Sequence, residues 1–442
     1  MNHDHGSNSY KKNSITLGGA VAMGTGVMIG AGIFALTGQI AELAGPLFPI
    51  AFFIGAIVTG FSSYSYIKMS NSWPSAGGIG MILQKCYGPG AVAAGAALLM
   101  ALSMVIAESL VARTFATYLL RPFNIGGGPL VPILSVGVIL FAYLVNIAGN
   151  RSIGLFSIVM AAIKIGGIAL FGIAALWSSG FGFAASSQSA GNFGATGFVA
   201  SVALAVLAFK GFTTVTNSGA EITDPNRNVG RAIMISIVLC VVVYLLVAFG
   251  VGSSLTIDQI IAAKDYSLAE AAKPALGQVG FLLTVLLAVV ATASAVLASV
   301  FAVSRMLAML TDMKMIPHSH FGMSGTIQRH TLVYTVVIAS FLAVFLDLSR
   351  IASLGAFFYL TMDMAVQWGV WRFRRTEIGA SGVVLLAALG FDASVLVAFT
   401  ALKLQSDPSI VVYAVIAIIS VFLFERAYLS RWLAPQNDSA RS

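Results

Sequence analysis

The chain has 442 residues, of which 58% are hydrophobic and only 9% are charged, and its formal net charge is +8. Soluble globular domains carry about 25% charged residues, so this composition excludes a soluble globular protein and a largely disordered chain. The basic residues are spread over short polar segments, which argues against a nucleic-acid-binding surface. We therefore expect an all-α polytopic membrane protein.

Twelve apolar segments have the length of about 20 residues that a helix needs to cross a bilayer. In chain order they are 16–40, 46–69, 90–120, 129–148, 153–178, 194–219, 232–254, 278–310, 332–348, 350–370, 381–402 and 409–430. The polar residues before them lack the short apolar core of a cleavable signal, so we expect the first segment to serve as the insertion signal.

Lysine and arginine set the orientation of such a chain, because cytosolic loops carry an excess of them. With the N-terminus in the cytosol, sixteen of the 24 basic residues fall on the cytosolic side and five fall outside. The bias predicts a multi-pass protein with both termini in the cytosol. The short loops and the absence of targeting signals favour the plasma membrane.

The first segment contains seven glycines, at positions 18, 19, 24, 26, 30, 32 and 38. Each glycine inside a helix costs roughly 1 kcal/mol relative to alanine. A helix that breaks inside a bilayer survives only where it lines a protein cavity, and such broken helices form the binding sites of many secondary transporters. We expect the first helix to be unwound around Gly26 to Gly32. The alternative is that the glycines only allow close helix packing.

The sixth segment has a comparable irregularity, since Lys210 and Gly211 precede a run of polar residues that ends near Gly219. Interruptions in the first and sixth helices predict two halves of five helices with inverted topology and a binding site between them. The alternative is a kinked sixth helix with a polar inner face. The expected units are a cytosolic tail (1–15), two five-helix repeats (16–178 and 194–371), a pair of further helices (381–430) and a second cytosolic tail (431–442).

Three blocks of these segments resemble the amino acid–polyamine–organocation (APC) superfamily of permeases. Residues 26–34 (GVMIGAGIF) are similar to the first-helix signature of that family, residues 209–212 and 221–233 to its sixth-helix block and following loop, and residues 291–305 to a block of its eighth helix. The resemblance implies a LeuT-like fold of five plus five helices and the transport of amino acids or amines. Thr213 stands where the family usually has an acidic residue.

A zwitterionic amino acid suits the two expected interruptions. Free backbone N–H groups at Ile29, Gly30, Ala31 and Gly32, at the start of a half-helix, could bind a carboxylate. Free carbonyl groups near Gly211 could accept hydrogen bonds from an ammonium group, while Phe209, Phe212 and Thr213 line the same gap. The alternative for the two phenylalanines is ordinary core packing.

Lys164 is the strongest candidate for coupling transport to an ion. It lies thirteen residues after Arg151, or roughly 20 Å along a helix, which is too deep for its side chain to reach the membrane surface easily. Its segment also resembles the fifth helix of proton-coupled family members, in which a lysine replaces a sodium ion. That resemblance implies contacts of Lys164 with the carbonyl of Gly26 and the hydroxyl of Ser294. The alternative is a structural lysine that bridges helices.

Further ionisable residues lie within apolar segments and are functional candidates because burying their charge is costly. Glu108 and Arg113 share the third segment, and either could pair with Lys210 or with Asp363 of the tenth segment. Glu108 could also replace the missing acidic residue of the sixth helix. Lys210, if it faced the site, would favour neutral or acidic substrates over cationic ones.

The chain lacks the motifs of other functional classes. It has no G-x-S-x-G or H-E-x-x-H motif and no histidine in an apolar segment, so we expect no enzyme, metal site or cofactor. Its two cysteines and the cysteine-free loop 121–129 argue against a disulfide-linked partner subunit. The partners predicted are an amino acid, a proton and the lipid bilayer. An exchanger, a polyamine or organocation transporter and a non-transporting amino acid sensor remain alternatives.

Overall fold

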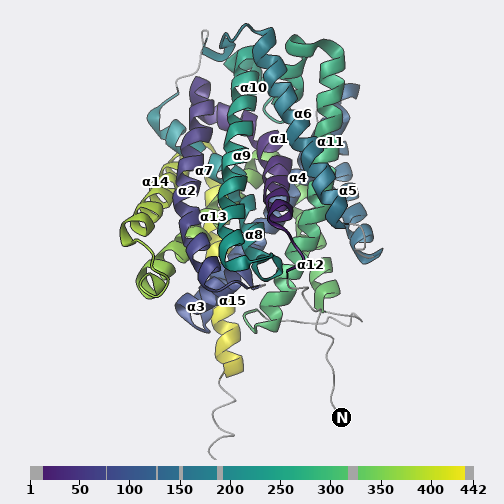
Figure 1. Ribbon diagram of the computed structural model, residues 1–442. Coiled ribbons are helices and arrows are strands. Elements are labelled where there is room, and N and C mark those ends of the chain that lie inside the picture. The colour runs from purple at the N-terminus through teal and green to yellow at the C-terminus, as the bar shows by residue number, and fades with distance from the viewer. Residues whose placement is uncertain are drawn as a thin grey trace, which may run out of the picture.

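The computed structural model describes residues 13–75, 77–125, 128–148, 153–186, 193–316 and 327–433. Most residues in these ranges are helical, and the one β-type pairing recorded there is an isolated parallel bridge between Ile15 and Ile222. Figure 1 shows the long helices running roughly side by side in one bundle, with α1 (Leu17–Ala44) in its interior.

Each of the twelve apolar segments coincides with helical structure. After α1 follow α2 (Phe48–Ser72), α4 (Ala91–Leu120), α5 (Leu130–Ala148), α6 (Ile153–Ser178), α7 (Ala195–Phe209) with α8 (Thr213–Asn217), α9 (Pro225–Ser254), α11 (Ser267–Asp312), α12 (Ile327–Phe345), α13 (Leu348–Gly369), α14 (Gly382–Ser406) and α15 (Pro408–Leu433). By length and composition, nine helical stretches of the described ranges are able to cross a membrane. The predicted multi-pass membrane protein is therefore confirmed, while the number of twelve spans remains a prediction.

Two short helices complete the architecture. The first, α3 (Gly78–Tyr87), follows α2 and contains the buried Cys86. The second, α10 (Ile257–Ala262), begins at a capping box in which Thr256 and Gln259 each bond to the other's backbone N–H. His330 lies buried in the first turns of α12.

The outer helices expose apolar side chains that a water-facing surface would not carry. On α5, Leu140, Phe141 and Leu144 are 46%, 55% and 63% exposed, and on α15 Ile416 and Leu423 are 58% and 61% exposed. Contiguous apolar surface of this kind marks contact with another apolar phase. These faces are suited to the hydrocarbon core of a bilayer.

The inner helices meet at α1, which packs against α6, α7, α9 and α11. Glycines permit these contacts at short range. A Cβ atom added to Gly32 would stand 2.8 Å from the carbonyl oxygen of Ala208, and one added to Gly30 would stand 2.6 Å from the Cβ of Ala295. Close helix packing, the alternative explanation for the glycines of the first segment, is therefore realised in this conformation.

The predicted unwinding of the first helix is wrong for this conformation. From Leu17 to Ala44 the backbone of α1 is α-helical without interruption. The cause is the same close packing, since neighbouring helices enclose the glycine-rich stretch on several sides. The sixth segment is irregular at the predicted place but is not unwound: after α7, the residues Lys210–Phe212 form a 3-10 turn with helical backbone dihedrals, and α8 follows directly as a single short helix.

Candidate functional site

The 3-10 turn of the sixth segment lies directly against the glycine-rich part of α1. A Cβ atom added to Gly211 would stand 2.8 Å from the backbone nitrogen of Met28 and 3.2 Å from the carbonyl oxygen of Gly24. The two segments that the sequence analysis selected are therefore brought together. Ile29 is fully buried beside this contact. Ala31 lies on α1, and its side chain falls outside the described residues.

The aromatic residues of the turn contact other helices rather than an open space. The ring of Phe209 lies 4.8 Å from that of Tyr244 on α9, and the ring of Phe212 meets the edge of Tyr66 on α2 at 5.3 Å. Thr213 donates a hydrogen bond of 2.9 Å to the carbonyl of Lys210. In this conformation both phenylalanines belong to the packed core, which was the alternative considered for them.

Tyr244 is a residue that the sequence analysis missed. Its buried hydroxyl lies 2.7 Å from the carbonyl oxygen of Met28 on α1 and 3.1 Å from that of Ala208 on α7. A single hydroxyl thus bridges the two segments at the level of Gly32, whose added Cβ atom would collide with it. A tyrosine within an apolar segment gives no sequence signal for this role, because its partners are backbone carbonyls of distant helices.

Lys164 of α6 lies deep in the bundle, where its side chain is only 4% exposed. Its Nζ stands 3.7 Å from the position that a Cβ atom on Gly30 would occupy, and Ala291 and Ala295 of α11 adjoin the same point. Within the described ranges no hydrogen bond joins Lys164 to Gly26 or to Ser294, whose hydroxyl instead donates to Ala291 at 3.0 Å. The implied contacts with Gly26 and Ser294 are therefore absent in this conformation, because α1 remains helical there and its carbonyls stay engaged.

Lys210 points toward α4 and α13. Its Nζ donates to the carbonyl oxygen of Ser103 at 2.8 Å and lies near the Ser103 hydroxyl at 3.0 Å, with the ring of Tyr359 at 5.9 Å. Its charge thus sits on the side of the 3-10 turn that faces α4. Asp363 of α13 accepts hydrogen bonds from Ser62 and Tyr66 of α2.

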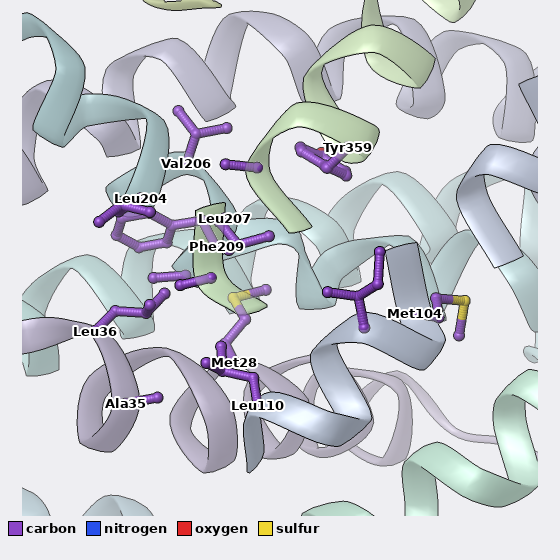
Figure 2. Close-up of a cluster of buried hydrophobic side chains, with 14 of the residues drawn as sticks. Met28, Ala35, Leu36, Met104, Leu110, Leu204, Val206, Leu207, Phe209 and Tyr359 are labelled. Carbon is purple, nitrogen blue, oxygen red and sulfur yellow. The ribbon is translucent and has the colours of Figure 1, made fainter. Parts of the chain in front are cut away.

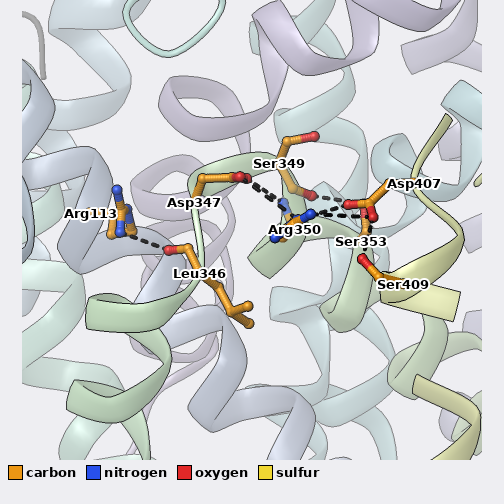
Figure 3. Close-up of polar contacts among 8 residues, drawn as sticks. All are labelled: Arg113, Leu346, Asp347, Ser349, Arg350, Ser353, Asp407 and Ser409. Carbon is orange, nitrogen blue, oxygen red and sulfur yellow. Dashed lines mark hydrogen bonds and ion pairs between the residues drawn. The ribbon is translucent and has the colours of Figure 1, made fainter. Parts of the chain in front are cut away.

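The pairings considered for Glu108 and Arg113 do not form. The carboxyl group of Glu108 is fully buried and has no hydrogen-bond partner among the described residues. Arg113 instead donates to the carbonyl oxygens of Ala343 and Leu346, both at 2.7 Å, at the end of α12. Figure 3 shows the contact with Leu346.

An apolar cluster fills the space between α1, α4, α7 and α13 (Figure 2). Its labelled members are Met28, Ala35 and Leu36 of α1, Met104 and Leu110 of α4, Leu204, Val206, Leu207 and Phe209 of α7, and Tyr359 of α13. A small ligand held between α1 and the 3-10 turn would meet predominantly hydrocarbon side chains here.

Polar contacts connect neighbouring segments at both ends of the bundle. At the end that contains the start of α1, Ile15 pairs with the backbone on either side of Ile222, and Arg305 forms a 2.7 Å ion pair with Glu221. At the opposite end, Lys264 pairs with Glu42 at 2.7 Å. The interior between the two ends contains the glycine-rich helix and the 3-10 turn.

A second set of contacts at that opposite end joins α13 to the connection between α14 and α15. Arg350 forms a 2.8 Å ion pair with Asp407, and Asp347 accepts from the backbone of Arg350 at the same distance (Figure 3). Among the described residues no group of three or more His, Cys, Asp or Glu side chains is arranged to hold a metal ion.

Comparison with known proteins agrees with this architecture. The model of a family described as amino acid permease matches residues 15–424. The chain is 29% identical over 404 residues to the inner membrane transport protein YbaT of Escherichia coli (strain K12), an alignment that covers 90% of this chain and 92% of the relative. It is 28% identical over 246 residues to the branched-chain amino acid permease BcaP of Lactococcus lactis, about half of each chain (51% and 52%).

A plant relative aligns over more residues than BcaP does. The vacuolar cationic amino acid transporter 2 of Arabidopsis thaliana is 28% identical over 375 residues, which covers 79% of this chain and 58% of the relative. The resemblance to the APC permeases is confirmed by these matches, and the expectation of a transporter rather than an enzyme is confirmed with it. The chain belongs to the amino acid permease family.

Proposed function

We propose that the protein moves amino acids with neutral side chains across the plasma membrane by proton-coupled alternating access. The observation that carries the proposal is the contact between the glycine-rich part of α1 and the 3-10 turn Lys210–Phe212, with Lys164 buried beside Gly30. These are the elements that a midplane substrate site of a secondary transporter requires.

The helix contacts support an inverted repeat of residues 16–178 and 194–371, followed by the helices of 381–430. Helices in equivalent positions of the two halves contact each other: α1 with α7, α2 with α9, α4 with α11, and α5 with α12. Some crossed contacts also come in matching pairs: α1 packs on α9 as α7 does on α2, and α4 packs on α13 as α11 does on α6. A two-fold relation between the halves would produce this pattern. The basic-residue bias supports a cytosolic location for both short tails.

The substrate site is proposed at the junction of the two segments. A local opening of α1 would free the N–H groups of Ile29, Gly30, Ala31 and Gly32 for the substrate carboxylate. Opposite them, Phe209, Gly211, Phe212 and Thr213 would contribute carbonyl groups and ring surface to the ammonium group and the side chain. Glycine lowers the cost of that opening because it contributes least to helix stability.

The preference for neutral amino acids rests on the surroundings of this junction. The apolar cluster of Figure 2 suits a hydrocarbon side chain, and Thr213 stands where the family usually has an acidic residue. The relatives named above include a branched-chain and a cationic amino acid carrier. The apolar surroundings of the junction favour a branched-chain amino acid over a cationic one.

Proton coupling is proposed at Lys164. Its ammonium group lies between α1 and α11, beside Gly30, and loss of its proton would remove a buried charge from that contact. Gly26 and Ser294 would become partners of Lys164 when α1 opens. Because Lys164 occupies the contact between α1, α6 and α11, its protonation state bears directly on the movement of α1.

The substrate can be found by counterflow into proteoliposomes loaded with one amino acid at a time, in sodium-free buffer. Leucine, isoleucine or valine should exchange readily, whereas lysine and arginine should not. Preferred exchange of arginine or of polyamines would contradict the neutral-substrate proposal. Binding of leucine, detected as a raised unfolding temperature, without any counterflow would identify a sensor rather than a transporter.

A further inference from the structure

Two aspartates meet in the interior on the side of the 3-10 turn away from α1. Asp363 of α13 and Asp392 of α14 are both completely buried, and their carboxyl groups interact across the contact between these two helices. The sequence analysis selected Asp363 but not Asp392, and neither has a role in the substrate site proposed above.

The surroundings of Asp363 suit a carboxylate anion. The hydroxyls of Ser62 and Tyr66 both donate to it. Gln367 fixes the direction of one of these donors, because its Nε2 donates to the Ser62 carbonyl at 2.9 Å and to the Ser62 hydroxyl at 3.3 Å. Two oriented O–H donors stabilise a negative charge that burial alone would disfavour.

The surroundings of Asp392 suit a neutral carboxylic acid. Apart from the neighbouring carboxyl group of Asp363, its carboxyl oxygens have no hydrogen-bond partner among the described residues. A buried, unpartnered carboxylate beside a second negative charge is strongly disfavoured, and such a group retains its proton instead. The contrast between the two aspartates therefore assigns the charge to Asp363 and the proton to Asp392.

The other titratable groups around the pair agree with this assignment. Tyr66 of α2 donates its hydroxyl to Asp363, and Tyr359 lies one helical turn before Asp363 on α13. Lys210 contributes an ammonium group on the other side of Tyr359, with its Nζ 5.9 Å from the centre of that ring. One ammonium group and two carboxyl groups balance in charge when the pair holds a single proton.

We propose that Asp363 and Asp392 form a proton-binding pair, separate from Lys164, that holds one proton and is coupled to the sixth helix through Tyr66. The ring of Tyr66 packs edge-on against Phe212 of the 3-10 turn, while its hydroxyl donates to Asp363. A displacement of Phe212 on substrate binding moves that donor and changes which carboxyl carries the proton. The coupling to the sixth helix depends on the substrate site proposed above, whereas the binding of one proton by the pair does not.

Infrared spectroscopy of the purified protein with carbon-13-labelled aspartate tests the pair without any substrate. The label separates the absorption of protonated aspartate from that of buried glutamates such as Glu108. At neutral pH, the wild type should show an aspartic acid C=O band that Asp392→Asn loses and Asp363→Asn retains. Absence of the band in the wild type, or its persistence in Asp392→Asn, would overturn the proposal, as would a band that disappears on addition of sodium.

Substrate then tests the coupling. A bound neutral amino acid should shift or diminish the band in the wild type. In Tyr66→Phe, which retains the ring against Phe212 but loses the donor to Asp363, the band should persist and ignore the substrate. A wild-type band that does not respond to an amino acid that demonstrably raises the unfolding temperature would refute the coupling. Failure of any amino acid to bind would instead count against the proposed function, and the substrate-free spectra would still decide the pair.

Discussion

Two alanine substitutions on α1 separate close packing from helix stability. Gly32 lies against α7 and α9: its added Cβ atom would stand 2.8 Å from the Ala208 carbonyl oxygen, 2.9 Å from the Ala208 Cβ, and in collision with the Tyr244 hydroxyl. Gly26, on the same helix, has no atom within 4 Å of an added Cβ atom. Gly26→Ala is therefore the matched control for Gly32→Ala.

The magnitudes follow from these distances. Overpacking a buried contact costs about 1–3 kcal/mol, and the backbone carbonyl at Ala208 leaves little room for relief, so Gly32→Ala belongs at the upper end of that range. Replacing a helical glycine by alanine returns about 1 kcal/mol. We expect Gly32→Ala to lower the free energy of unfolding by about 1–2 kcal/mol and Gly26→Ala to raise it by up to about 1 kcal/mol.

The assay is the unfolding temperature of both variants in the same detergent, followed by transport in proteoliposomes. Gly26→Ala should be the more stable variant and yet transport more slowly, because about 1 kcal/mol added to the cost of unwinding α1 corresponds to about a fivefold lower rate. Equal unfolding temperatures for the two variants would refute the packing argument. Unchanged transport by Gly26→Ala would refute the requirement for α1 to open.

Three further predictions concern contacts outside this pair of glycines. Tyr244→Phe removes the hydroxyl that bridges α1 and α7, which should lower the free energy of unfolding by about 1 kcal/mol. The contact between α1 and α7 should also loosen, so backbone amides of α1 should exchange hydrogen faster, and an unchanged exchange rate would contradict the bridge. Glu221→Gln breaks the partly exposed ion pair with Arg305. A double-mutant cycle on Glu221 and Arg305 should give a stabilising coupling energy of at most about 1 kcal/mol. A coupling energy of zero would mean that this ion pair does not stabilise the end of the bundle where α1 begins. The pKa of Asp407 is held below its usual range, because hydrogen bonds from Ser409 and Arg350 outweigh the opposing effect of burial. The stability that the Asp407 carboxylate contributes is therefore present above its unfolded-state pKa of about 4 and is lost as the pH falls through the lower folded-state pKa. Asp407→Asn should flatten the acid limb of the plot of unfolding free energy against pH, and an unaltered acid limb would contradict this.

The sequence predicted the helical segments well because membrane-spanning helices are determined by length and hydropathy. Each of the twelve apolar segments overlaps helical structure, and the polar run after Lys210 marked the 3-10 turn of the sixth segment. Both signals are local in the chain.

The errors concern features that depend on neighbouring helices. Glycines predicted an unwound first helix, but the same residues also allow the approach of α7 and α11, and sequence alone does not decide between the two. The partners of Arg113 and Lys210 are backbone carbonyls, which no sequence pattern identifies. Tyr244 and Asp392 were missed for the same reason, since their importance comes from what surrounds them in space.

The central claim is tested most directly by uptake of radiolabelled leucine into proteoliposomes under an inward proton gradient, with sodium absent, for the wild type and for Lys164→Ala. The account predicts that the wild type accumulates leucine above equilibrium, that a protonophore abolishes the accumulation, and that Lys164→Ala only equilibrates leucine without responding to the gradient. Accumulation that persists in Lys164→Ala, or wild-type accumulation that requires sodium, would contradict it.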